Sequence, residues 1–240
     1  MNTYRRTEIA VGGFFIAATV ASIAGSVALG SVLDGPDYLV GLADHEPRVI
    51  AAVLLFLIAA TSAFATAFLL FPILRRHAEG LAAGYVGLRA FENLLYVVGT
   101  VGLLIMLTVS QSDTVGTTQL SIVGTALLAL HHWSVSIGTL IFFGVGGTIL
   151  NYVLYRSGLV PRWLSGWGLV AALMAFAYGL VGLFGADTGL GSPWMLLAMP
   201  IAFQEMVFAG WLIVKGFDQG SVTPAQPEQQ LSVPEVHSYS

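Results

Sequence analysis

Six long apolar segments restrict what this chain can fold into. Each is close to the roughly 20 residues that a helix needs to cross about 30 Å of hydrocarbon. Because lipid offers no hydrogen bonds, only helices or closed barrels satisfy a spanning backbone, and unbroken apolar runs of this length indicate helices. The segments are Ile9–Leu33, Val49–Leu74, Leu81–Val109, His132–Tyr155, Trp163–Phe184 and Pro193–Val214. The sequence predicts an all-α, polytopic transmembrane helix bundle with six spans.

Composition supports a membrane-embedded chain and excludes other classes. Of 240 residues, 56% are hydrophobic and 9% are charged, and the mean hydropathy is +0.83, whereas a soluble domain carries about 25% charged residues. The absence of cysteine excludes disulfides, thiolate metal sites and thiol nucleophiles. Without a basic patch that contains interleaved aromatic residues, nucleic acid is not an expected partner. The expected surroundings are the lipid bilayer.

The positions of arginine and lysine predict the orientation of the chain. With six spans, seven of the nine basic residues fall on one side: Arg5, Arg6, Arg75, Arg76, Arg156, Arg162 and Lys215. Arg48 falls on the other side, and Arg89 lies within a span. Cytoplasmic loops carry an excess of basic residues. The sequence therefore predicts an inner-membrane protein with both termini in the cytoplasm. The first apolar run, at about 25 residues, is longer than a signal-peptide core, so it is expected to be an uncleaved span.

Two regions fall outside this simple pattern. The run 117–155 is apolar over about 39 residues, which would make a helix of about 60 Å, twice the thickness of a bilayer core. Because the distribution of charged residues places the two ends of this run on opposite sides of the membrane, the run must cross it an odd number of times. We therefore expect one span, preceded by an amphipathic helix at the outer interface with Leu120, Val123, Leu127 and Leu130 on one face.

Residues 1–217 form the predicted helix-bundle domain. Residues 218–240, rich in Gln, Pro, Ser and Glu, are predicted to be a disordered cytoplasmic tail.

The strongest functional lead is a polar group inside the third apolar run. Arg89, Glu92 and Asn93 share one helix face by their three- and four-residue spacings, and Tyr85 and Tyr96 extend that face. Each central charge costs roughly 2.5–3.5 kcal/mol to insert, so two charges nearly cancel the gain from a dozen apolar residues. The third helix therefore requires a polar partner, or compensation between Arg89 and Glu92.

The sixth run supplies a candidate partner. Counting from the opposite ends of the two spans places Glu205 and Glu92 both near the membrane midplane, with Gln204 beside Glu205. Pro200 is expected to loosen the sixth helix nearby. One arginine and two glutamates leave an excess negative charge, so one carboxyl group is expected to hold a proton. Such a cluster is either a ligand or proton site or a structural device that fixes helix packing.

The histidines and the small residues carry weaker signals. His131 and His132 are adjacent, so they point about 100° apart on a helix and cannot share a metal in the usual i, i+4 manner. His132 is retained as a secondary candidate, mainly as an interfacial residue. No metal and no cofactor is expected. Small residues in the first run, from Ala18 to Gly30, favour close helix packing, with a homodimer as the alternative.

Several motifs together resemble a known family. They are Tyr4–Thr7 (YRRT), Gly84–Glu92 (GYVGLRAFE), Leu159–Ser165 (LVPRWLS), Gln204–Met206 (QEM) and Gly210–Phe217 (GWLIVKGF). This combination resembles the bacterial multi-pass membrane family catalogued as domain of unknown function 4386, over about residues 1–217. The resemblance implies a small inner-membrane protein with six or seven helices and brings no established activity. The polar candidates fall inside the matching motifs, whereas the histidine pair falls where the family is variable.

Three functional hypotheses follow from the sequence. The first is a protein that binds or passes a small ligand or proton, or acts as a membrane subunit or sensor. The second is a membrane-embedded enzyme that acts on a lipid or isoprenoid with a glutamate as acid or base. The third is a purely structural partner. A water-accessible cavity that reaches Glu92 from at least one side favours the first hypothesis. A lateral opening to lipid, with carboxylates and a second polar group converging on it, favours the second, and full pairing of the polar group without a cavity favours the third.

Overall fold

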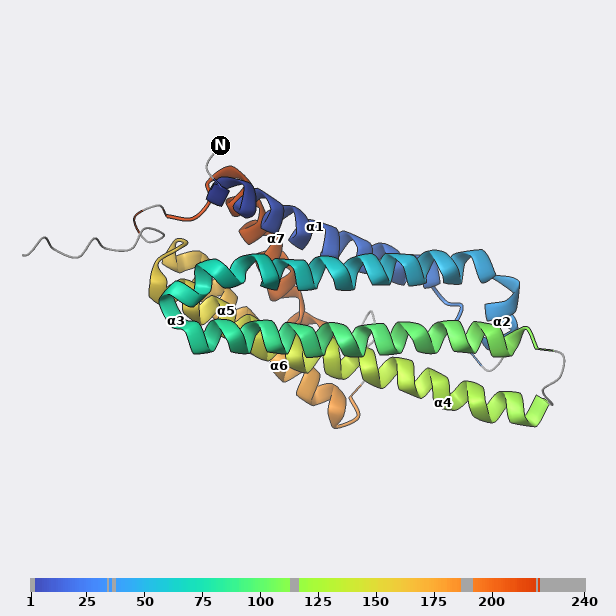
Figure 1. Cartoon of the computed structure of the whole chain (residues 1–240). Helices are drawn as coiled ribbons and strands as arrows, with labels where there is room; N and C mark the ends of the chain where they lie inside the picture. Colours follow the sequence, from blue (N-terminus) through green and yellow to red (C-terminus); the bar gives the residue numbers. More distant parts are fainter. Residues whose placement is uncertain are drawn as a thin grey trace, which may run out of the picture.

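The computed structural model describes residues 3–33, 35, 38–112, 117–186, 192–218 and 220. The regular elements in these ranges are all helices, and the long ones run nearly side by side (Figure 1). They are α1 (Thr3–Leu29), α2 (Tyr38–Asp44), α3 (Glu46–Ser110), α4 (Thr117–Ser136), the π-helix η1 (Ile137–Phe142), α5 (Phe143–Ser157), α6 (Arg162–Leu183), the 3-10 helix η2 (Pro193–Leu197) and α7 (Met199–Val214). The predicted disordered tail lies almost wholly outside the described residues.

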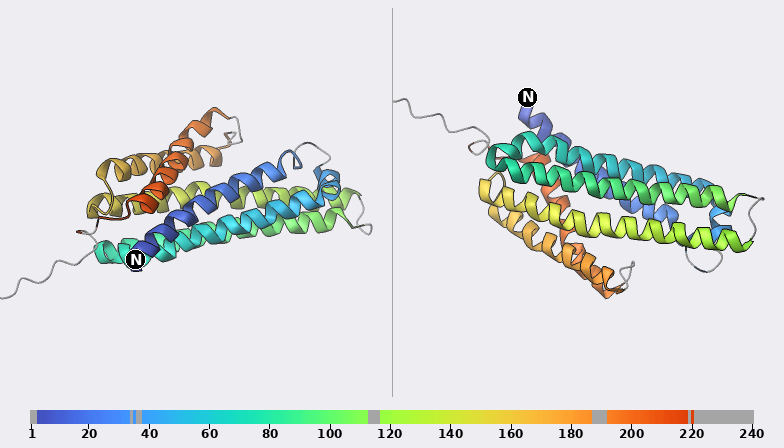
Figure 2. Two further views of the ribbon diagram at one scale, coloured as in Figure 1. Left: turned by 90° about the horizontal axis from the view of Figure 1, so that it is seen from above. Right: turned by 60° about the horizontal axis from the view of Figure 1, so that its bottom comes forward.

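Helix α3 is a hairpin without a loop. Its 65 residues turn back at Ala78, where φ is −160° and ψ is 84°. The two arms, 46–77 and 79–110, lie side by side in all views (Figures 1 and 2). The charged sequence around Arg75 and Arg76 separates two apolar runs, so the second and third predicted spans become the arms of one bent helix. This bend sets the second arm, which carries Arg89, against the first.

Helices α4, η1 and α5 form one continuous rod from Thr117 to Ser157. The rod runs along the second arm of α3 (Figure 1). In the described residues, α4 therefore continues into α5 without the break that the sequence predicted between an interfacial helix and the fourth span. The physical reason is packing: Leu127 and Leu128 contact the buried cluster that contains Leu103 and Leu107. Of the apolar stripe that suggested a helix on the membrane surface, Leu127 packs against another helix, whereas Val123 and Leu130 are exposed by 41% and 42%.

Helices α6 and α7 form a second layer against this set. Helix α6 packs on α5, and α7 crosses to α1. Near the start of α1, Gly12 lies against the backbone of α7, and the rings of Phe15 and Phe208 meet edge to face at 5.5 Å. The two helices then diverge toward the other end of the bundle (Figure 2). Helices α1 and α7 thus enclose a wedge between them.

A latch of ionic and backbone hydrogen bonds closes the narrow end of this wedge. Arg5 donates to the last carbonyls of α7, including Leu212 at 2.8 Å, and also contacts Glu8 at 3.3 Å. Glu8 is fully buried and accepts a hydrogen bond from the backbone N–H of Phe217 at 3.0 Å. Gly216, with φ of +77°, provides the turn that brings this N–H into reach. The latch satisfies carbonyls that a helix C-terminus leaves open.

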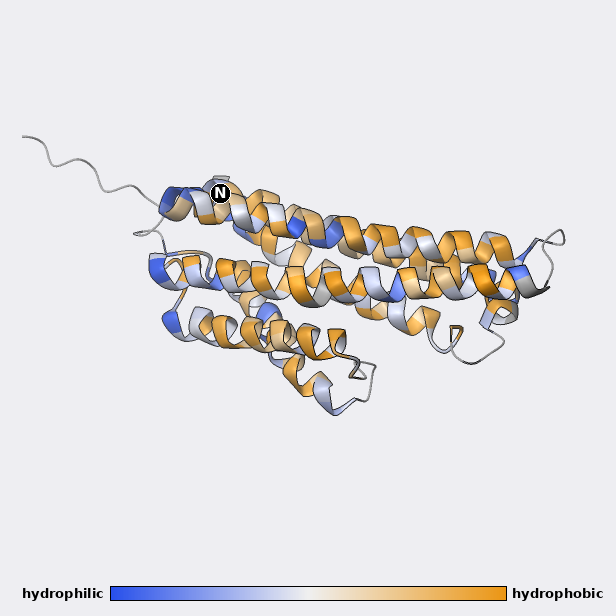
Figure 3. Ribbon diagram, turned by 90° about the horizontal axis from the view of Figure 1, so that it is seen from below, coloured by the Kyte–Doolittle hydropathy of each residue, from blue (hydrophilic) through white to orange (hydrophobic). Residues whose placement is uncertain are grey.

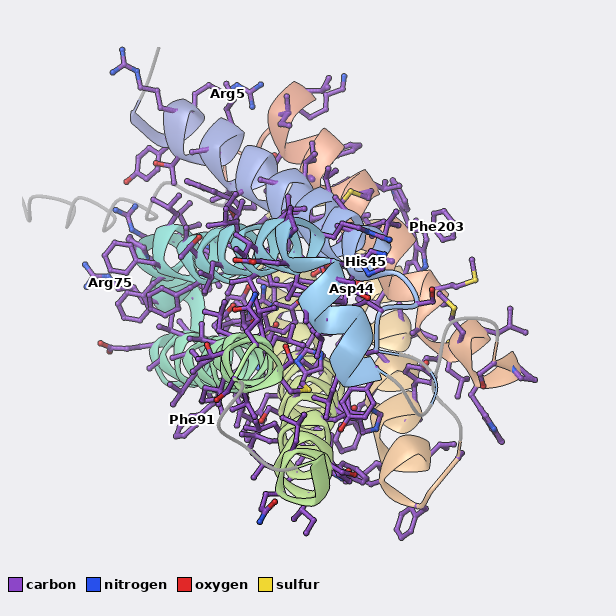
Figure 4. The ribbon with its side chains drawn as sticks, turned by 90° about the vertical axis from the view of Figure 1, so that its right-hand side faces the viewer. Arg5, Asp44, His45, Arg75, Phe91 and Phe203 are labelled. Atoms are coloured by element: carbon purple, nitrogen blue, oxygen red, sulfur yellow. The ribbon has the colours of Figure 1, made fainter. Side chains whose placement is uncertain are left out.

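The surface and the ends of the bundle have the character of a membrane protein. Four described helices, counting the bent α3 as one, are long and apolar enough to cross a membrane. Figure 3 shows hydrophobic residues along most of their length and hydrophilic residues at the end with the α3 bend. Large apolar side chains such as Phe91 and Phe203, each 59% exposed, project outward from the bundle (Figure 4). Such a surface is suited to lipid rather than water.

The contact between α5 and α6 depends on a glycine. A Cβ atom added at Gly144 would lie 2.8 Å from the Cα atom of Phe176, so Gly144→Ala must separate the two helices. We expect this substitution to lower the free energy of unfolding by about 1–3 kcal/mol, as other overpacked cores do. Gly87→Ala is the matched control, because nothing lies within 4 Å of its Cβ position. Thermal melting in detergent measures both, and equal melting temperatures would contradict the close contact.

Candidate functional site

A buried ion pair forms the centre of the site. Arg89 Nη1 lies 3.0 and 3.2 Å from the two carboxylate oxygens of Glu92, and both residues are buried. The spacing of three residues on the second arm of α3 places these side chains on one face. Arg89 Nη2 also donates to the carbonyl of Ala63 on the first arm at 3.4 Å. The pair therefore ties together the two arms of the hairpin.

Aromatic and amide groups complete the surroundings of the pair. The ring of Phe143, at the start of α5, lies 5.4 Å from the guanidinium carbon of Arg89, a distance typical of a cation–π contact. Asn93 donates to the carbonyl of Arg89 at 2.6 Å. The hydroxyl groups of Tyr96 and Ser22 on α1 are 3.2 Å apart. The guanidinium Nε is the one Arg89 nitrogen without a hydrogen-bond partner among the described residues.

The two polar residues of α7 point in different directions. Glu205 faces the main cavity beside Arg89, Glu92 and Asn93. Gln204 is 2% exposed and donates to Asn151 Oδ1 at 3.3 Å. A second, small cavity of about 10 Å³ borders both Gln204 and Glu205. It is also lined by Tyr85 and Arg89. Gln204 thus belongs to a neighbouring polar contact rather than to the main cavity.

The predicted loosening of the sixth helix at Pro200 is wrong. Pro200 lies in the first turn of α7, where a proline is tolerated because its missing N–H would have no helical partner. The preceding residues form the separate helix η2, which ends before Ala198. Glu205 is therefore held on a regular helix.

The main cavity has a volume of about 280 Å³ and is polar at one end. Its polar lining consists of the ion pair with Asn93, Tyr96 and Glu205, plus Thr19 and Ser22 of α1. Its other walls are mainly alanine and isoleucine side chains from α1, the first arm of α3, α6 and α7. Binding sites for small molecules share this pattern of apolar walls with a few convergent polar groups. The volume is just below the usual range of about 300–1,000 Å³ for drug-sized ligands.

The cavity opens on the side of the bundle where α1 and α7 diverge. Two of its lining residues, Ile23 on α1 and Ala202 on α7, are exposed at the surface, Ile23 by 60%. Toward the narrow end of the wedge, the buried cluster that contains Phe15, Phe208 and Leu212 closes the path. The opening is therefore lateral, between two helices with apolar outer faces.

The histidines in the described part of the chain do not line either cavity of this site. His131 Nδ1 is 2.8 Å from the carbonyl of Gly99, a contact that connects α4 to α3. His132 is exposed, packs edge to face with Trp133 at 5.4 Å and lines a separate small pocket with Gly179. Within the described part of the chain, no group of three or more His, Asp or Glu side chains could hold a metal ion.

Sequence reasoning missed three contributors to the site. Asn151 is the lone amide in the fourth apolar run, so the logic that identified Arg89 could have found it. Phe143 and the alanines of the cavity wall gave no such signal, because an aromatic or small residue in an apolar run is ordinary. In the small-residue stripe of α1, Gly25 packs against Phe56 and Ala18 lines the cavity, whereas Ser26 and Gly30 are exposed.

Comparison with known sequences identifies the family. The family described as "Domain of unknown function (DUF4386)" matches residues 10–216. The chain belongs to this family. The DUF4386 match covers the whole cavity, and it confirms the family indicated by the sequence motifs. Arg5 and Glu8 of the latch lie just outside the matched residues.

More distant comparisons add little about activity. An "Uncharacterized protein" of the archaeon Archaeoglobus fulgidus is 30% identical over 96 residues. The aligned part is 38% of this DUF4386 protein and 55% of the relative, so the chain spans about half the length of that relative. No solved structure matches the chain. Any statement of function therefore depends on the site itself.

Proposed function

We propose that this DUF4386 protein binds a small amphipathic ligand that enters its cavity from the bilayer. The observation that carries the proposal is the position of Arg89, Glu92 and Glu205 at one end of a cavity with otherwise apolar walls. The polar end suits the head of a ligand, and the apolar end suits its body. A purely structural ion pair requires no adjoining space, whereas this pair borders a cavity of about 280 Å³.

We further propose a six-pass arrangement in a bacterial inner membrane. The passes are α1, the two arms of α3, the α4–α5 rod, α6, and α7 with η2. The described basic residues outside the spans, apart from Arg48, belong to segments at one end of the bundle, where the latch joins α1 to α7 (Figure 1). The excess of arginine at this end supports a cytoplasmic location for both termini. The cavity then opens into the outer half of the bilayer.

A membrane-embedded enzyme is the second candidate function. Glu205 is the observation in its favour, because among the described residues no group is hydrogen-bonded to its carboxyl. A carboxyl group that faces a laterally open cavity can act as a general acid or base toward a lipid or isoprenoid. Turnover of such a substrate distinguishes this function from ligand binding or transport.

Accessibility labelling tests the proposed ligand site directly. Since the chain has no cysteine, a single introduced cysteine gives a clean signal. Ala59 lines the cavity, whereas Ala67, on the same arm, is packed in the buried core. With the protein in lipid nanodiscs, we expect N-ethylmaleimide to modify Ala59→Cys about tenfold faster than Ala67→Cys, because thiol reactivity follows access.

Competition by a second amphipathic molecule completes this test. Octan-1-ol is expected to slow the modification of Ala59→Cys in a saturable manner, because both reagents enter the same space. Equal labelling rates for the two cysteines, or an absence of saturable protection, would contradict the proposed function. Ala51→Cys, at an exposed position of the same arm outside the cavity, reports any effect of octanol on the bilayer alone.

A further inference from the structure

The ionisable groups at the cavity do not balance in charge. Arg89 contributes one positive charge, and Glu92 and Glu205 each contribute one negative charge when ionised. Arg89 is engaged by both carboxylate oxygens of Glu92 and by the carbonyl of Ala63. Glu205, by contrast, faces the cavity with no hydrogen-bonding partner in the described part of the chain. With all three groups ionised, the cluster would hold one uncompensated negative charge away from bulk water, a costly arrangement that a proton or a bound cation relieves.

We propose, building on the ligand-binding function above, that the cavity selects an amphipathic organic cation, with Glu205 as its counter-charge. A protonated amine or a quaternary ammonium group beside Glu205 makes the cluster neutral. An anion would increase the excess to two negative charges, because the positive charge of Arg89 is already paired with Glu92. A neutral molecule would leave the excess charge of the ionised cluster to be neutralised by a proton. The charge count therefore favours a single positive charge on the ligand.

The walls of the cavity suit the organic part of such a cation. The alanine and isoleucine side chains provide apolar surface, and the ring of Tyr96 lies on the wall. Aromatic faces attract alkylammonium groups. A strongly hydrated metal cation would find few oxygen ligands there, since the described residues contain no cluster of three acidic or histidine side chains. The lateral opening provides access for molecules that partition into lipid.

Charge balance also links cation binding to proton release. The ionisable groups that line the two cavities with Glu205 are Arg89, Glu92, Tyr85 and Tyr96, all on α3. The parts of the cavity wall formed by α1, α5 and α6 contribute no ionisable side chain in the described residues. In the empty protein a proton neutralises the cluster, and an arriving cation displaces it. One proton is released for each cation bound, so affinity rises with pH.

Three probes of similar size test the charge selectivity in the Ala59→Cys labelling assay. They are hexyltrimethylammonium, its neutral isostere 2,2-dimethyloctane, and octanoate. We expect hexyltrimethylammonium to protect the cysteine at about tenfold lower concentration than the isostere, and octanoate to protect least. Glu205→Gln should remove the advantage of the cation over the isostere. Glu79→Gln, which removes an exposed carboxyl at the α3 bend, should keep that advantage.

Calorimetry distinguishes a role of Glu205 as the counter-charge of the ligand from a merely structural role, because only the first links cation binding to proton release. Titration of hexyltrimethylammonium in two buffers of different ionisation enthalpy should give one proton released per cation in the otherwise unmodified protein and none in Glu205→Gln. Equal protection by the cation and the isostere, or no binding of the cation, overturns the inference. If the isostere still protects Ala59→Cys in that case, the proposed ligand site stands and only its charge selectivity is lost.

Discussion

Replacement of Arg89 by leucine is expected to destabilise the protein by about 3–5 kcal/mol, the cost of removing one partner from a buried ion pair. Glu92 would keep a buried carboxyl group without its two guanidinium contacts. The carbonyl of Ala63 would lose the donor that connects the two arms of α3. Reversible unfolding in mixed micelles with increasing dodecyl sulfate measures the change.

The double variant Arg89→Leu/Glu92→Leu separates the ion pair from simple loss of packing. Buried ion pairs exchanged for apolar residues of similar volume are often neutral in stability. We therefore expect the double variant to recover most of the stability lost by Arg89→Leu. If the double variant is as unstable as the single one, an unpaired Glu92 is not the cause of the loss. If the double variant recovers its stability but hexyltrimethylammonium no longer protects Ala59→Cys in it, the ion pair is needed for function rather than for folding.

The apolar runs were sufficient to predict the helical architecture. Runs of this length admit little besides helices in lipid, and each predicted segment lies mainly within helix. The spacing of Arg89 and Glu92 likewise predicts that they share a face, and the structure has them 3.0 Å apart. Depth counting predicted that Glu205 would approach this pair, and in the structure all three line one cavity. The spacing of residues along a helix and their distance from the ends of a span can both be read from a single sequence.

Packing between helices explains what the sequence did not predict. Residues 117–130 read as a surface helix because their apolar stripe gives no information about whether lipid or another helix covers it. In the structure this part of the chain packs against Leu103 and Leu107, which are distant in sequence. Gln204 and Glu205 were grouped because they are adjacent, although neighbouring helical residues point about 100° apart. The cavity itself arises from the divergence of α1 and α7, which no local pattern encodes.

The latch between the first and last helices is the second place where a single substitution should have a large effect. Arg5→Leu would leave the fully buried Glu8 without its charge partner and remove the donor to the last carbonyls of α7. We expect a loss of about 3–5 kcal/mol in the free energy of unfolding. Arg6→Leu, at the adjacent exposed arginine, should change stability by less than about 0.5 kcal/mol.

A distance measurement distinguishes loss of the latch from general destabilisation. Spin labels on Arg6→Cys and Val214→Cys, both exposed, report the separation of α1 and α7 at the closed end of the wedge. Arg5→Leu in this background should broaden the distance distribution and shift it to longer values. The lost hydrogen bonds leave the bond from Phe217 N–H to Glu8 and apolar contacts such as Phe15 with Phe208 to hold the two helices together there. An unchanged, narrow distribution would show that these remaining contacts close this end, and that Arg5 serves only to satisfy the α7 carbonyls.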